Sequence, residues 1–110
     1  MKKLESLLST EEIELRRLEC RYNTFEKNYQ FSVSYIEDLR HSMTIAYARD
    51  DHKEYNELAK ALKNVRKEKK FNKRKVGKYN LIVQQQTCRV DNIKEALKEL
   101  KDLQKSGEEV

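Results

Sequence analysis

The chain contains no proline and no tryptophan, and only two of its 110 residues are glycine. Proline and glycine are the strongest signals for turns and breaks, so their scarcity excludes a fold built from many short elements. Hydrophobic residues make up 37% of the sequence, whereas charged residues make up 39%. A compact globule needs more apolar surface than this, while two long helices that pack along a narrow seam need no more.

Long apolar runs are also missing. No stretch approaches the roughly 20 apolar residues that span a bilayer as a helix, and the first 20 residues lack the apolar core of a signal peptide. We therefore expect a cytoplasmic protein with no membrane partner. Cys20 and Cys88 would lie about seven residues out of register in the hairpin derived below, so we expect reduced thiols and no disulfide.

The apolar residues that are present recur at alternating steps of three and four in two segments. The first ladder consists of Leu4, Leu8, Leu15, Leu18, Tyr22, Phe25, Tyr29, Ile36, Leu39, Met43 and Ala46. The second consists of Tyr55, Leu58, Leu62, Val65, Val76, Tyr79, Val83, Val90, Ile93 and Leu97. This spacing places each ladder on one stripe of an α-helix. It argues against disorder, which is otherwise typical of so polar a chain.

The two ladders are mirror images about the polar stretch 49–52. Rungs pair across it with numbers that sum to 101, as with Ala46 and Tyr55 or Ile36 and Val65. An antiparallel helical hairpin requires this relation between two independent ladders. The sequence therefore predicts an all-α fold, a long antiparallel hairpin of coiled-coil type.

The first helix is predicted from about residue 3 to Ala48. Ser9 and Glu12 have the spacing of a capping box, which favours a helix start at that point. The ladder begins earlier, at Leu4, so we expect one continuous helix and leave open an irregularity near Ser9.

The second helix is predicted to start at Asp51, which with Glu54 has the spacing of an N-terminal cap. It should end near Lys105, where Ser106 and Gly107 supply a stop. The predicted organisation is a single helical-hairpin domain, residues 1–105 with the turn near 49–52, followed by a flexible tail at residues 106–110.

The seam between the ladders is interrupted by polar residues. The interruptions are Ser32, Lys69, Tyr29, Asn72, Glu11 and Gln86. The first four would form two adjacent layers in the middle of the hairpin. A polar layer inside a coiled coil fixes the register of its helices at some loss of stability. The alternative is that the two helices separate there.

Nine apolar residues lie off the ladders, at positions that an isolated hairpin would turn to water. They are Ile13, Phe31, Val33, Tyr35, Ile45, Tyr47, Phe71, Leu81 and Ile82. Phe31 and Tyr35 are one turn apart, and the mirror relation places Phe71 at nearly the same height. We interpret these three residues as a second apolar face that binds a protein partner, another copy of the chain or a folded-back end. A homodimer that forms a four-helix bundle is the simplest such assembly.

Basic residues are concentrated in one segment of the second helix. From Lys60 to Lys78 there are ten Lys or Arg residues against the single acid Glu68, a net charge of +9, while the rest of the chain sums to −4. Such a segment attracts phosphate backbones or acidic proteins, although in coiled coils it is more often a solvated face. The candidate polyanion-binding residues are Lys63, Arg66, Lys67, Lys70, Lys73, Arg74 and Lys78.

Signals of catalysis are absent from the sequence. Asp38 and His41 are three residues apart on one helix, a spacing typical of a local hydrogen bond. The two histidines and two cysteines have no metal-ligand spacing, and there is no glycine-rich phosphate loop or nucleophile motif. We therefore predict no enzyme activity, no metal, no cofactor and no small-molecule substrate.

Two short motifs resemble a known group of proteins. Asp38-Leu-Arg-His41 on the first helix and Lys69-Lys70-x-x-Lys73 on the second resemble small helical proteins encoded by prophages of low-GC Gram-positive bacteria, which carry Asp-x-x-His and Arg-Arg-x-x-Lys. Lysines replace the arginine pair here, and the match covers only the middle of the chain. The resemblance implies a non-enzymatic phage accessory protein that binds a host or phage macromolecule. A protein partner is the favoured interpretation, and nucleic acid bound by residues 60–78 is the alternative.

Overall fold

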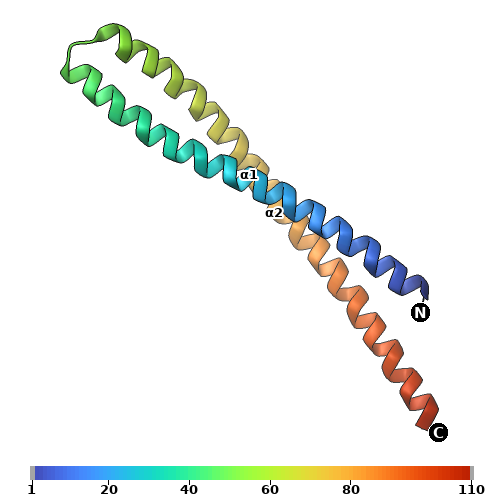
Figure 1. Ribbon diagram of the computed structural model, residues 1–110. Coiled ribbons are helices and arrows are strands. Elements are labelled where there is room, and N and C mark those ends of the chain that lie inside the picture. The colour runs from blue at the N-terminus through green and yellow to red at the C-terminus, as the bar shows by residue number, and fades with distance from the viewer. Residues whose placement is uncertain (1, 110) are drawn as a thin grey trace. The chain divides into compact units, whose positions relative to one another are not determined.

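The computed structural model describes residues 2–109, with side chains for residues 2–107. This part of the chain contains two helices and no strand: α1 spans Lys2–Ala48 and α2 spans His52–Glu109 (Figure 1). The predicted all-α antiparallel hairpin is confirmed. α1 runs through Ser9 without interruption, so the expected continuous helix is confirmed as well.

The turn between the helices is fixed by hydrogen bonds at both helix ends. Asp50 has a φ of 55°, in the left-handed region. Its N–H donates to the carbonyl of Tyr47 at 3.1 Å, while the N–H of Asp51 donates to the carbonyl of Ala46 at 3.0 Å. These two bonds form the Schellman motif, which satisfies the last carbonyls of a helix. The Asp51 carboxylate then accepts the N–H of Glu54 at 3.1 Å, which confirms the predicted cap of α2.

The C-terminal end of α2 differs from the prediction. The expected stop at Lys105 is wrong, because α2 continues through Ser106 and Gly107 to Glu109. Gly107 does not adopt the positive φ of a left-handed helix cap, so its backbone continues the helix. The predicted tail of residues 106–110 therefore begins as helix, and Val110 lies outside the described residues.

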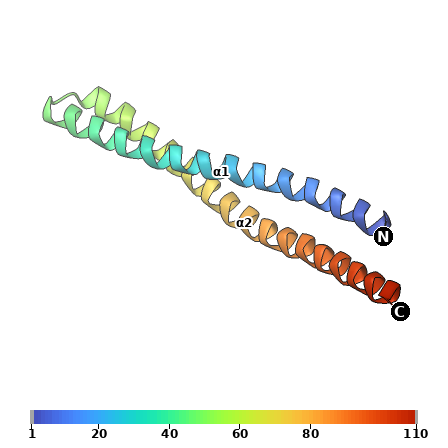
Figure 2. The same ribbon diagram turned by 60° about the horizontal axis from the view of Figure 1, so that its bottom comes forward.

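Contacts divide the hairpin into two compact units. The turn unit comprises Tyr22–Lys78, and the terminal unit comprises Met1–Arg21 with Tyr79–Val110. Within the turn unit the two helical segments lie side by side in both ribbon views (Figures 1 and 2). Each unit is a helix pair with its own packing.

An apolar cluster holds the turn unit together. Ile36, Leu39, Leu62 and Val65 are buried in this cluster, and further apolar side chains pack against it. Ile36 with Val65 and Leu39 with Leu62 are pairs whose numbers sum to 101, so the predicted register is confirmed here. Burying one such side chain contributes about 1.5–3 kcal/mol.

Next to this cluster lies the predicted polar layer. Ser32 is 3% exposed and Asn72 is 9% exposed, while Tyr29 and Lys69 are half-buried. Residues this well covered require the two helices to remain in contact. The alternative, that the helices separate at this layer, is wrong.

The terminal unit depends on polar contacts in addition to a few buried apolar residues. Gln86 Nε2 donates to the Glu11 carboxylate at 2.6 Å and to its backbone carbonyl at 3.0 Å. Arg89 Nε lies 3.4 Å from the same carboxylate. Glu11 and Gln86, the polar residues that interrupt the two ladders, are thus hydrogen-bonded to each other. The buried apolar residues of this unit are Leu18, Val90 and Leu97.

Candidate macromolecule-binding surface

A hollow in the turn unit contains two of the predicted partner-binding aromatics. Phe31 of α1 is 72% exposed and Phe71 of α2 is 50% exposed, and both line this hollow of about 450 Å³. The other residues that line it are Asn28, Ser32, Lys67, Glu68 and Asn72. We call this feature the aromatic hollow.

The rings at the aromatic hollow are held by neighbouring side chains. Phe31 stacks on Tyr35, with ring centroids 6.2 Å apart and planes inclined by 22°. Phe71 packs edge-on against the half-buried Phe25 at 6.4 Å. The Nζ atom of Lys75 lies 5.5 Å from the Phe71 ring centroid, within the range of a cation–π contact. The structure therefore brings Phe31 and Phe71 to one hollow and Tyr35 beside it.

A second depression of about 540 Å³ lies in the same unit and is strongly basic. We call it the basic groove. Its apolar lining consists of Met43, Ala59 and Leu62, and its cationic lining consists of Lys63, Arg66, Lys67 and Lys70. Four of the seven predicted polyanion-binding residues thus meet in one groove. Lys67 lines both the basic groove and the aromatic hollow, so the two predicted sites adjoin.

The other three predicted polyanion-binding residues lie outside the basic groove. Lys73, Arg74 and Lys78 are all exposed, but they line neither depression just described. They continue the exposed basic side of α2 toward the end of the turn unit.

The two units differ in net charge. The turn unit contains 14 basic and 8 acidic residues, a net charge of +6, while the terminal unit contains 10 basic and 11 acidic residues, a net charge of −1. Much of the excess lies in the paired segments 23–36 and 65–78. There nine basic residues face only Glu26 and Glu68, a net charge of +7.

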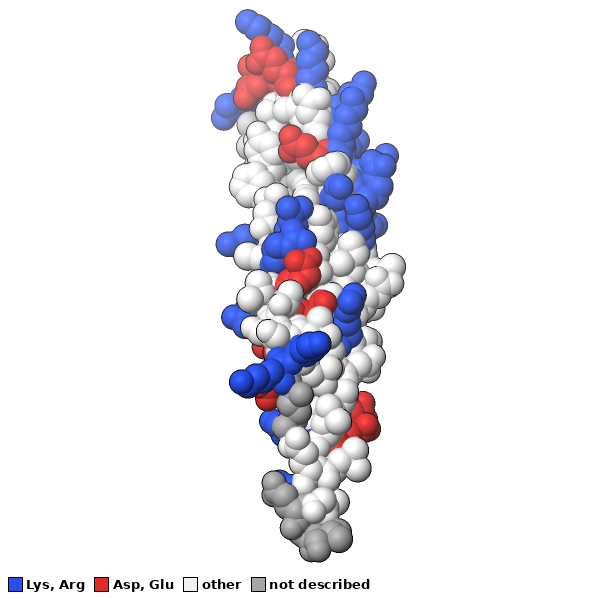
Figure 3. Space-filling view, turned by 90° about the vertical axis from the view of Figure 1, so that its right-hand side faces the viewer, with Lys and Arg blue, Asp and Glu red and all other residues white. Residues whose placement is uncertain are grey.

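The basic side chains from Lys60 to Lys75 have no acidic partner among the described side chains, since none of them forms an ion pair with a carboxylate. Figure 3 shows a band of Lys and Arg along one edge of this unit. Clustered charges of one sign raise the local concentration of oppositely charged ligands, so this surface is suited to an anionic partner.

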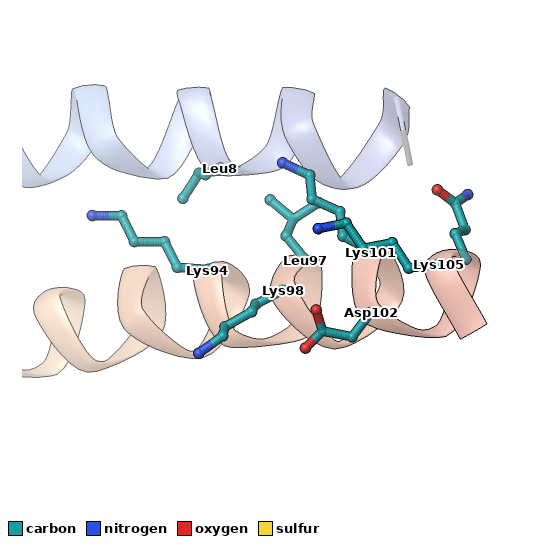
Figure 4. Close-up of a pocket in the computed structure, with 8 residues that line it drawn as sticks. Leu8, Lys94, Leu97, Lys98, Lys101, Asp102 and Lys105 are labelled. Carbon is teal, nitrogen blue, oxygen red and sulfur yellow. The ribbon is translucent and has the colours of Figure 1, made fainter. Parts of the chain in front are cut away.

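The terminal unit has a hollow of its own, which was not predicted. It measures about 590 Å³, and Figure 4 shows Leu8 of α1 and Leu97 of α2 pointing toward the opposite helix in it. Its lysines are Lys94, Lys98, Lys101 and Lys105. From Asp91 to Lys105, however, four acidic residues alternate with these four lysines, so the segment has no net charge.

Four residues of the aromatic hollow were not predicted as site residues. Ser32 and Asn72 were named only as part of the polar layer. Asn28, Phe31 and Tyr35 follow one another at steps of three and four, so the signal for Asn28 was present on α1. Glu68 was noted only as the single acid of the basic run, and the structure places it in the lining of the aromatic hollow.

The remaining candidate residues form no cluster. Asp38 and His41 are exposed on α1, and Cys20 and Cys88 are exposed as well. Within residues 2–107, no three His, Cys, Asp or Glu side chains are grouped so as to hold a metal ion. Neither α1 nor α2, over its described length, is apolar enough to cross a membrane.

No protein-family model, no curated protein and no solved structure matches this chain. The features that bear on function are therefore the geometry and charge of the turn unit.

Proposed function

We propose that the chain is a non-enzymatic nucleic-acid-binding protein that uses the aromatic and basic surface of its turn unit. The observation that carries this proposal is the set of Lys and Arg side chains around the basic groove, none of which has a carboxylate partner among the described residues. Cationic side chains that neutralise phosphates release condensed counterions, which supplies much of the affinity for nucleic acid.

The adjacency of the two predicted sites favours nucleic acid over a protein partner. The centre of a protein interface is depleted in lysine, whereas Lys67 lies in both depressions and Lys75 covers Phe71. Exposed rings among cations are typical of surfaces that bind nucleic acid.

The test is a pair of matched charge-neutralised proteins. The turn-unit variant carries Lys63→Gln, Arg66→Gln, Lys67→Gln and Lys70→Gln, and the terminal-unit variant carries Lys94→Gln, Lys98→Gln, Lys101→Gln and Lys105→Gln. Both sets lie exposed on α2 and line a depression, and both change the net charge from +5 to +1. Binding to an arbitrary 20-base-pair DNA duplex is measured at several salt concentrations.

We expect the turn-unit variant to lose measurable binding at physiological salt. Each phosphate contact contributes about 0.9 to the logarithmic salt slope, so the slope should fall by roughly 3 to 4. The terminal-unit variant should keep nearly the wild-type slope. Equal losses in the two variants, or a wild-type protein that retains neither DNA nor RNA at about 50 mM salt, would overturn the proposal.

A protein partner is the second candidate, because Phe31 is 72% exposed on an otherwise polar helix. In this case the chain would be a prophage accessory protein that docks onto a host or phage protein in the cytoplasm through Phe31, Tyr35 and Phe71. Affinity capture from a nuclease-treated bacterial lysate tests it. A partner that is lost with Phe31→Ala but retained by the turn-unit charge variant would favour this candidate.

The homodimer remains a prediction. Pairing two turn units would bring together two net charges of +6, whereas the terminal unit has a net charge of −1. The terminal unit also carries exposed large apolar side chains, namely Leu7, Ile13, Leu81, Leu100 and Leu103. A dimer would therefore associate through terminal units. Light scattering at micromolar concentration tests this, and a monomer mass would exclude it.

A further inference from the structure

We infer that the turn unit binds single-stranded nucleic acid in preference to duplex, with bases stacking on Phe31 and Phe71 in the aromatic hollow. This inference rests on the proposed function and adds the form of the nucleic acid. Its basis is the position of the two rings, which come from opposite helices and line one depression.

Phe31 is the more accessible of the two rings, since the Nζ atom of Lys75 lies over the Phe71 ring. Tyr35 and Phe25 each pack against one of them, but Phe31 remains 72% exposed and Phe71 remains 50% exposed. The hollow measures about 450 Å³, within the range of sites that enclose small organic ligands. A hollow of this volume has room for a base. Bases inside a duplex are covered on both faces by their neighbours, and extruding one carries a penalty of unstacking, so an unpaired strand is the better ligand.

A polar side chain in the same hollow suits the edge of a base. Asn28 lines the hollow and is exposed, whereas Ser32 and Asn72 are buried. An asparagine amide both donates and accepts hydrogen bonds. All four bases present donors or acceptors on their edges, so Asn28 does not demand one sequence. We expect weak sequence preference.

Cations next to the hollow suit the phosphates of the strand. Lys67 lies in the wall that the aromatic hollow shares with the basic groove, and Lys75 lies over Phe71. A strand whose bases stack in the hollow therefore has cations for its flanking phosphates, which is the combination found in proteins that bind single strands. An acidic protein segment would use the same cations but would not require exposed ring faces.

Glu68 is the one carboxylate in the lining of the aromatic hollow. It is exposed, and its negative charge repels a phosphate at short range. Glu68→Gln keeps the size and polarity of the side chain and removes that repulsion. We therefore expect this substitution to tighten binding to a single strand about two-fold or more at low salt, where such interactions are least screened.

The experiment compares three labelled DNA probes by fluorescence anisotropy: oligo(dT) of 20 nucleotides, an abasic strand of the same length, and a duplex of 20 base pairs. The first two carry the same phosphates, so their difference isolates the bases. Phe31→Leu removes ring stacking but keeps an apolar side chain. Tyr47→Leu is the matched control, because Tyr47 is 74% exposed in the same unit but does not line the hollow.

Wild-type protein should bind oligo(dT) at least about five-fold more tightly than the abasic strand, since stacking on one aromatic ring accounts for a factor of this size or more. It should also prefer oligo(dT) to duplex. Phe31→Leu should remove most of the difference in affinity between oligo(dT) and the abasic strand, and it should leave duplex binding nearly unchanged. Tyr47→Leu should change neither that difference nor duplex binding. Circular dichroism confirms that each variant is helical.

Duplex binding equal to or tighter than oligo(dT) binding would overturn this inference and leave the proposed function intact. The same holds if wild-type protein binds oligo(dT) and the abasic strand equally, because phosphates alone would then account for binding, or if Phe31→Leu weakens all three probes equally, because Phe31 would then act without contacting the bases. If no probe binds at about 50 mM salt, both this inference and the proposed nucleic-acid-binding function are overturned. A protein partner would then be the remaining candidate for the aromatic hollow.

Discussion

The turn unit and the terminal unit are built from the same two helices, yet they are stabilised and charged differently. The turn unit has a buried apolar cluster around Ile36 and Leu39 and a net charge of +6. The terminal unit has a polar contact set centred on Glu11 and a net charge of −1. Charge excess and apolar packing thus occur together in one part of the chain.

This pairing has a physical consequence. Like charges repel, so a net charge of +6 destabilises the helix pair that carries it. The apolar cluster and the Schellman turn at Asp50 offset that repulsion. A polyanion relieves it directly. The unit with the buried apolar cluster is therefore also the unit that an anionic partner would stabilise most.

The largest expected effect on stability comes from truncating the apolar cluster. Leu39→Ala should lower the free energy of unfolding by about 2–5 kcal/mol, because it opens a cavity among buried side chains. Leu18→Ala in the terminal unit should have a smaller effect, since Leu18 is outside that cluster. Urea unfolding followed by circular dichroism measures both. Equal losses would show that the two units do not differ in this way.

A smaller effect is expected at the polar contacts of the terminal unit. Glu11→Ala should cost about 1–3 kcal/mol, because the Gln86 amide keeps only its bond to the backbone carbonyl of residue 11 and both it and Arg89 lose the carboxylate. The neighbouring Glu12→Ala is the control, since Glu12 forms only a long contact of 3.9 Å with the exposed Arg16; such surface pairs contribute under about 1 kcal/mol. Thermal unfolding should separate the two variants clearly. Similar melting temperatures would exclude a structural role for the Glu11 contacts.

The smallest expected effect is a gain in stability at the two glycines, one in each unit. A Cβ atom at Gly77 meets nothing within 4 Å, and alanine in a helix interior is favoured over glycine by about 1 kcal/mol. Gly77→Ala should therefore stabilise the protein by up to that amount. Gly107→Ala is also free of clashes, but it lies in the last turn of α2, so its gain should be near zero. A loss of stability with Gly77→Ala would indicate that this position needs glycine.

The register of the turn unit was predictable because heptad ladders repeat many times. Pairs such as Leu39 with Leu62 are set by the whole pattern, so one polar gap does not shift them. The cap at Asp51 was predictable for a different reason, since its signal is local and acts within four residues. Both kinds of information are carried by the sequence itself.

Other features were not predictable from pattern alone. A helix stop at Ser106 and Gly107 requires Gly107 to adopt a left-handed backbone conformation. Where no contact enforces that conformation, glycine can continue the helix, as Gly107 does. Asp50 takes the left-handed position at the turn instead. The adjacency of the aromatic hollow and the basic groove at Lys67 depends on side-chain positions around α2, which the spacing of charges does not specify.

The most direct test of the central claim is to map where a bound strand contacts the chain. An oligo(dT) probe with several thymines replaced by 5-bromouracil is photocrosslinked to the wild-type protein, and the crosslinked peptides are identified by mass spectrometry. The account predicts crosslinks in the turn unit, foremost at Phe31, Tyr35 and Phe71. Crosslinks confined to residues 79–105, or spread evenly over both units, would contradict it.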